Sequence, residues 1–99
     1  MKVRISGRAR ARIRKQDEWW RSERLDAPDL FKQELEASFE RILRAPKVRQ
    51  QHGQIAGEPV WRILMRKTEQ HVYYTVDEAA GEVVIETVWG ARRGRGPKL

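Results

Sequence analysis

Arginines, two histidines and two tyrosines are the side chains of this chain that could do chemistry. Arg62 and Arg66 fall on one face of a predicted strand, so their guanidinium groups could converge on a phosphate. His71, on the next predicted strand, could act as a general acid or base because an ordinary histidine titrates near neutrality, and Tyr73 could donate a proton. The alternative interpretation is that these residues are solvated on the surface of a sheet.

Cleavage of RNA through its 2′-hydroxyl needs such a set of groups. One group removes the hydroxyl proton, another stabilises the extra charge on the phosphate, and a third protonates the leaving oxygen. Other chemistries lack their residues, because the chain has no cysteine, no glycine-rich phosphate loop after a strand and no Ser-His-Asp arrangement. His52 has no second ligand at metal spacing, and the polarity of its loop explains it. Neither a metal nor another cofactor is predicted.

The charge of the chain favours a polyanionic partner. The net charge is +7, and residues 1–15 hold seven basic groups and no acidic one. Arg8, Arg10, Arg12 and Arg14 alternate there and would cover about half of a helix circumference, forming a broad polyanion-binding surface. A solvated helix face is the competing explanation.

The elements that position these residues can be predicted from spacing. The 99 residues allow one domain, 1–99. Residues 2–6 alternate basic and apolar side chains as a short strand does, and Ser6 is placed to cap a helix that runs from Gly7 to about Arg24. Its apolar stripe is Ala9, Ile13, Gln16 and Trp20, and we expect the neighbouring Trp19 to pack as well.

A second helix follows a break at Asp26–Asp29. Phe31, Leu35, Phe39, Ile42 and Leu43 recur at the spacing of a buried face, and Pro46 follows the end of the helix. A short connection between two helices predicts an antiparallel helical hairpin. Residues 46–59 lack a period and are predicted to be a loop.

The second half of the chain has the period of strands. Residues 60–66, 71–76 and 83–89 are predicted strands, which gives the order β-α-α-β-β-β. The predicted class is α+β, with a two-helix hairpin packed on one face of a small twisted antiparallel sheet. We expect residues 91–99 to form a flexible basic tail. No apolar run approaches the ~20 residues of a membrane span, so we expect a cytoplasmic protein.

These elements and several local sequences together resemble the RelE/ParE superfamily of type II toxin–antitoxin toxins. The resemblance covers nearly the whole chain. It rests on the opening strand with Ser6–Ala9, on the Phe31, Leu35, Phe39 and Leu43 ladder, and on Trp61–Leu64, Val72–Val76 and Val83–Arg93. It implies a toxin, associated with plasmid stabilization, that a cognate antitoxin neutralises. The antitoxin would use the surface of Arg8, Arg10, Arg12 and Arg14.

The two branches of the superfamily imply different activities. The ParE-like branch poisons DNA gyrase, and here Trp89, Arg92, Arg93 and Arg95 would bind that target. The RelE-like branch is a ribosome-dependent endoribonuclease acting on messenger RNA, and Arg62, Arg66, His71 and Tyr73 would then be catalytic. Nucleolytic relatives often place a tyrosine or histidine on the last strand, where this chain has Trp89, Gly90 and Ala91. This departure favours the ParE-like activity, with the ribonuclease, or an inactive member that only binds its antitoxin, as alternatives.

Overall fold

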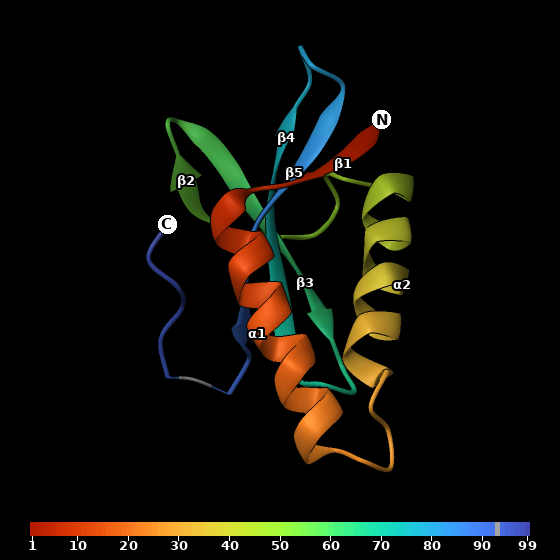
Figure 1. The fold of residues 1–99 in the computed structure, drawn as a ribbon. Helices are drawn as coiled ribbons and strands as arrows, with labels where there is room; N and C mark the ends of the chain where they lie inside the picture. The colour runs from red at the N-terminus through yellow and green to blue at the C-terminus, as the bar shows by residue number, and fades with distance from the viewer. Residues whose placement is uncertain (93) are drawn as a thin grey trace.

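A computed structural model describes residues 1–92 and 94–99 as two helices on one face of a five-stranded sheet (Figure 1). In chain order the elements are β1 (Lys2–Ile5), α1 (Gly7–Glu23), α2 (Leu30–Arg44), β2 (Gln50–Ile55), β3 (Glu58–Met65), β4 (Gln70–Asp77) and β5 (Glu82–Gly90). The spatial order of the strands is β1-β5-β4-β3-β2. The predicted α+β class is therefore confirmed, and Figure 1 shows the two helices running antiparallel as a hairpin.

Helix α1 begins where the sequence predicts. Ser6 has an extended backbone, and its Oγ accepts a hydrogen bond from the backbone N–H of Ala9 at 3.0 Å. Ala9 and Trp20 are buried against the core, as expected from the apolar stripe. Trp19 was expected to pack as well, and it does so only in part: its ring contacts Trp20, but 49% of its surface is exposed. One step along a helix turns a side chain by about 100°, so the neighbour of a buried residue need not face the core.

Helix α2 begins at Leu30, directly after the predicted break at Asp26–Asp29. Asp29 is the N-cap residue but makes no side-chain capping hydrogen bond among the described residues, and its carboxylate instead pairs with Arg21 of α1 at 3.0 Å. Phe31, Leu35 and Ile42 are buried. Their burial confirms most of the apolar face that the spacing predicts, but Leu43 was expected on the same face and is exposed instead.

Strand β2 lies inside the predicted loop. It pairs with β3 through a two-residue turn, in which Ala56 and Gly57 have φ of 50° and 81°, as in a type I′ hairpin. The sequence conceals this hairpin because β2 is polar, because the register shifts between Gln51 and Gln54, and because alanine replaces the usual asparagine of such turns.

The sheet is mixed, whereas the prediction was an antiparallel sheet. β1 pairs with β5 in parallel, with Val3 opposite Val83, while the other neighbouring strands are antiparallel. Alternation in a sequence indicates which side chains share a face, but it says nothing about the direction of a partner strand. The core lies between the sheet and the helices, and no helix in the described ranges is long and apolar enough to cross a membrane.

Candidate functional site

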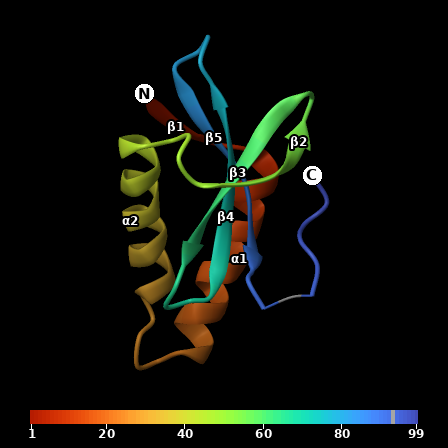
Figure 2. The same ribbon diagram turned by 180° about the vertical axis from the view of Figure 1, so that it is seen from behind.

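The face of the sheet opposite the helices, here called the open face, carries the candidate residues. Figure 2 views the molecule from this side. Arg62 of β3 stands opposite Tyr73 of β4, which in turn stands opposite Thr87 of β5. Tyr73 and Thr87 are almost fully buried although they lie outside the main core, so the open face has a packed floor.

Four side chains meet on this floor and form a set that we call the ring cluster: Arg62, Tyr73, His71 and His52. The ring of Tyr73 lies edge-to-face with both imidazoles, with centroids 5.0 Å from His52 and 5.9 Å from His71. Arg62 donates a hydrogen bond from Nη1 to the Tyr73 hydroxyl at 3.4 Å. Its Nε donates to the side-chain oxygen of Gln50 on β2 at 2.9 Å, which fixes the guanidinium between the strands.

Electrostatics distinguish His71 within this cluster. Burial lowers the pKa of His71 below its ordinary value, and the positive charges of Arg62 and His52 lower it further. His71 is therefore neutral at pH 7, with a ring nitrogen able to accept a proton. A neutral imidazole beside a fixed guanidinium is the combination needed by a general base next to a phosphate.

Tyr74, the neighbour of Tyr73, has a structural role. Its side chain packs in the core, and its hydroxyl donates to the backbone oxygen of Pro46 at 2.8 Å. Burial raises the pKa of Tyr74 to about 12. Since Tyr74 points into the core and stays protonated, Tyr73 is the tyrosine whose ring belongs to the open face, where it is covered by its neighbours.

Arg66 lies outside the ring cluster. Strand β3 ends at Met65, so Arg66 begins the exposed turn that leads to β4. Four residues of extended chain separate it from Arg62, about 13 Å between backbone positions. The structure thus brings together three of the predicted catalytic residues, Arg62, His71 and Tyr73, and adds His52.

The C-terminal tail lies against the edge of this site. The indole Nε1 of Trp89 donates to the backbone oxygen of Arg95 at 3.0 Å, and Arg8 donates to the backbone oxygen of Lys98. Gly96 passes so close to His52 that a methyl group on Gly96 would lie 2.6 Å from Cε1 of the imidazole. Pro97 is buried. In both ribbon views the chain end lies beside β2, which carries His52 (Figures 1 and 2).

The other predicted target-binding residues differ in their surroundings. Trp89 is half-buried, and the guanidinium of Arg12 stands over its ring, 4.4 Å from the centroid. Arg92 is exposed and pairs with Glu69 at 2.6 Å. Arg93 lies outside the described residues.

The four alternating arginines of α1 divide into two pairs. Arg8 and Arg12 turn toward the tail and β5, and Arg12 donates from Nε to the backbone oxygen of Val88 at 2.6 Å. Arg10 and Arg14 instead line a groove of about 350 Å³ between α1 and α2. The predicted broad cationic surface is thus divided between two sides of one helix.

His52 is the residue of the cluster that the sequence did not indicate. The sequence predicts a loop over residues 46–59, and a loop gives no reason to place His52 near Arg62. The pairing of β2 with β3 brings His52 onto the face that holds Arg62. The remaining signal was weak, a histidine beside a glycine. In the part of the chain that the structure describes, no group of three or more His, Cys, Asp or Glu residues could hold a metal ion.

Comparisons with known proteins bear on the fold. No family model matches the sequence, and no curated protein matches it. Among solved structures, the chain is similar to the isolated RelE toxin of E. coli, with a TM-score of 0.58 and 16% sequence identity. The match covers 93% of this chain and 85% of the other. This similarity shows that the chain has the fold of the RelE toxin.

Proposed function

We propose that the protein is the toxin of a toxin–antitoxin pair and that it cleaves messenger RNA on the ribosome. The observation that carries the proposal is the ring cluster, which joins Arg62, Tyr73 and two imidazoles on the open face. The similarity to the RelE toxin supports the same activity. The imidazoles on β2 and β4 also support the proposal, because they supply acid-base groups although the end of β5 has no tyrosine or histidine.

The reaction would break the phosphodiester bond through the neighbouring 2′-hydroxyl. Neutral His71 removes the hydroxyl proton, and the 2′-oxygen forms a bond to phosphorus. Arg62 stabilises the negative charge that develops on the phosphate oxygens. The bond from phosphorus to the 5′-oxygen then breaks, and His52, on the other side of the Tyr73 ring, is the group placed to give a proton to that oxygen. The products are a 2′,3′-cyclic phosphate and a 5′-hydroxyl end.

Tyr73 has a positioning role in this scheme. Its hydroxyl accepts the hydrogen bond from Arg62, and its ring contacts both imidazoles. A buried ring that touches every other member can hold the spacing of the cluster without itself transferring a proton. Arg66 would contribute at most charge for the incoming strand, because it stands in the turn after β3.

A gyrase poison of the ParE-like class is the second candidate function. One observation favours it: β5 ends in Trp89 and Gly90 and is followed by Ala91, with no acid-base side chain among these residues. In this function Trp89, Arg92, Arg93 and Arg95 would bind gyrase. The two activities predict different products, cut RNA or inhibited supercoiling.

The cognate antitoxin is the expected partner in either function. The groove between α1 and α2 has an apolar floor that includes Ile13 and Phe39, with Arg10 and Arg14 along it. An acidic, partly disordered antitoxin segment would order there, with its carboxylates on the arginines. Titration calorimetry with the product of the neighbouring open reading frame should show binding, and Arg10→Ala with Arg14→Ala should weaken it.

The proposed function is tested with purified protein in two parallel reactions. In a translation reaction with end-labelled messenger RNA, the protein should produce fragments with 5′-hydroxyl ends, and His71→Gln should abolish them. In a gyrase reaction the same preparation should leave supercoiling intact. If supercoiling is inhibited and the RNA stays intact, the ribonuclease activity is contradicted and the gyrase-poisoning function is supported.

A further inference from the structure

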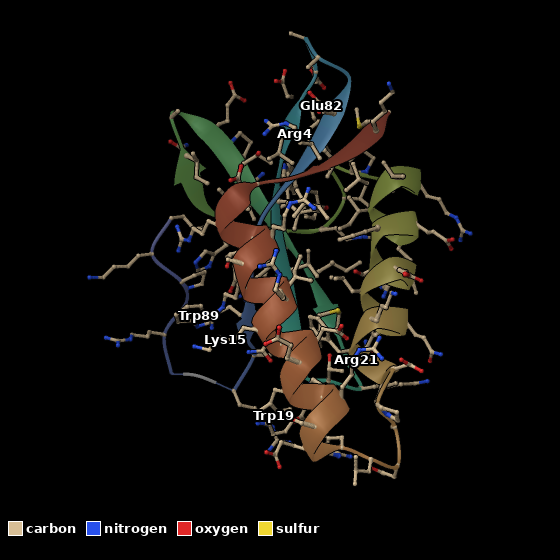
Figure 3. The ribbon with its side chains drawn as sticks, in the orientation of Figure 1. Arg4, Lys15, Trp19, Arg21, Glu82 and Trp89 are labelled. Atoms are coloured by element: carbon tan, nitrogen blue, oxygen red, sulfur yellow. The ribbon has the colours of Figure 1, made fainter. Side chains whose placement is uncertain are left out.

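One side of α1 carries a line of basic and aromatic side chains that the ring cluster does not use. Arg8, Arg12, Lys15 and Trp19 recur at steps of four, three and four, so they share one side of the helix. We call this line the α1 strip. Figure 3 shows Lys15 and Trp19 on the same side of α1 as Trp89.

Two hollows lie along the α1 strip and share Arg12. The smaller, of about 260 Å³, is lined by Arg8, Arg12, Lys15 and Trp89. The larger, of about 530 Å³, lies near the C-terminal end of α1, and its lining includes Arg12, Trp19, Trp20, Arg24 and Lys67, together with Arg92 and its salt-bridge partner Glu69. Each hollow therefore combines an indole with several cationic side chains.

The indole of Trp19 is held in place. Its ring packs edge-to-face on Trp20 with 5.6 Å between centroids and 75° between planes, and Trp20 is only 5% exposed. The guanidinium of Arg24 lies 4.8 Å from the Trp20 ring centroid. A buried neighbour thus fixes a half-exposed tryptophan beside a row of charges. Such an arrangement leaves little side-chain entropy to lose when a flat ligand binds.

We propose that the α1 strip and its hollows bind single-stranded RNA, with one base against Trp19 and phosphates along Arg12, Lys15 and Lys67. This inference rests on the proposed function: the α1 strip would hold the part of the RNA strand next to the cleaved bond. Exposed aromatic rings beside a cationic groove suit unpaired bases, since only unpaired bases offer a free face for stacking. A volume of about 530 Å³ lies in the range of ligand pockets.

The strip also leads to the ring cluster. Trp89, which lines the smaller hollow, stands directly opposite His71 on adjacent strands. Arg12 reaches from α1 over the ring of Trp89 at 4.4 Å. An RNA strand could thus pass from the larger hollow over Arg12 and Trp89 to His71.

The test is the fluorescence anisotropy of a labelled single-stranded 12-nucleotide 2′-O-methyl oligouridylate titrated with the full chain. This probe cannot be cut through its 2′ position, so binding is measured apart from cleavage. Trp19→Ala should weaken binding about tenfold, as expected for loss of one stacked base. Trp19→Phe should retain most of the affinity. The matched control is Leu25→Ala, which removes another exposed apolar side chain near the same helix end.

The charge contribution is tested by salt dependence. Lys15→Ala and Lys67→Ala should each flatten the slope of log affinity against log salt by about 0.7, the value for one phosphate contact on a single strand. Arg44→Ala, at the end of α2, removes the same charge and should leave the slope unchanged. Equal binding by the Trp19→Ala and Leu25→Ala proteins would overturn the inference. The inference would also be overturned if polyglutamate, at equal charge concentration, displaced the labelled probe as well as the unlabelled oligonucleotide does.

These results separate the inference from the proposed function. If messenger RNA stays intact but oligonucleotide binding depends on Trp19, the proposed ribonuclease activity is contradicted and RNA binding by the α1 strip is supported. If messenger RNA is cleaved but oligonucleotide binding does not depend on Trp19, the ribonuclease activity is supported and RNA binding by the α1 strip is contradicted.

Discussion

The guanidinium of Arg62 donates a hydrogen bond to the hydroxyl of Tyr73 at 3.4 Å, and the two residues stand opposite each other on β3 and β4. This contact connects the basic and the aromatic halves of the ring cluster. Because Tyr73 is almost fully buried, it offers Arg62 a fixed partner, and Gln50 holds the guanidinium from the other side. A charge fixed before the substrate arrives stabilises a transition state better than one that must reorganise.

Arg62→Ala should reduce RNA cleavage by about 10²- to 10³-fold, the usual cost of losing one preorganised charge donor. Its free energy of unfolding should change by less than about 1 kcal/mol, because the side chain is only partly buried. Arg66→Ala is the matched control, and it should cut almost normally. The measurement is the rate of fragment formation in a translation reaction. If both variants were equally impaired, the assignment of Arg62 to the reacting phosphate would fail.

Stability should fall in acid because of His71. Its pKa is lowered in the folded protein, so the unfolded chain binds more protons between that pKa and the ordinary value of 6.5. The contribution is fully present above pH 6.5 and is lost as the pH falls through 6.5 toward the folded pKa. Urea midpoints at pH 7.5 and 5.5 should therefore differ less in His71→Gln than in the wild type. An identical difference in both proteins would contradict the shift.

Glu34 of α2 should be a stabilising residue, since its carboxylate holds the turn between β3 and β4. It accepts hydrogen bonds from the backbone N–H groups of Lys67 and Thr68 at 2.8 and 2.9 Å, and from the Thr68 hydroxyl at 2.6 Å. Glu34→Ala should lower the free energy of unfolding by about 1–3 kcal/mol, because it leaves donors unpaired. Glu36→Ala, at an exposed position of the same helix, should cost less than about 0.5 kcal/mol in the same urea titration.

Gly96→Ala should disturb His52 directly. The added methyl group would lie 2.6 Å from Cε1 of the imidazole, so either the ring or the tail must move. The imidazole NMR signals of His52 should shift, and cleavage should slow together with them. Gly94→Ala is the control, because no described atom lies within 4 Å of the corresponding methyl group. Unchanged His52 signals in the Gly96→Ala variant would contradict the contact between the C-terminal tail and His52.

Much of the fold could be predicted from the sequence because periodicity reports burial. The ladder of Phe31, Leu35 and Ile42 and the alternation around Trp61 depend on local spacing, and both were confirmed. Strand β2 and the parallel pairing of β1 depend on partners distant in the chain, which local spacing cannot express. The site divides in the same way. Arg62, His71 and Tyr73 share a predictable face, whereas His52 reaches them only through an irregular hairpin.

The central claim is tested most directly by brief induction of the protein in cells without antitoxin, followed by mapping of new 5′ ends across all messenger RNA. The account predicts new ends within translated regions, phased with codons, and their absence on induction of Arg62→Ala. Arrested growth with intact messages would contradict it and would favour the poisoning of gyrase.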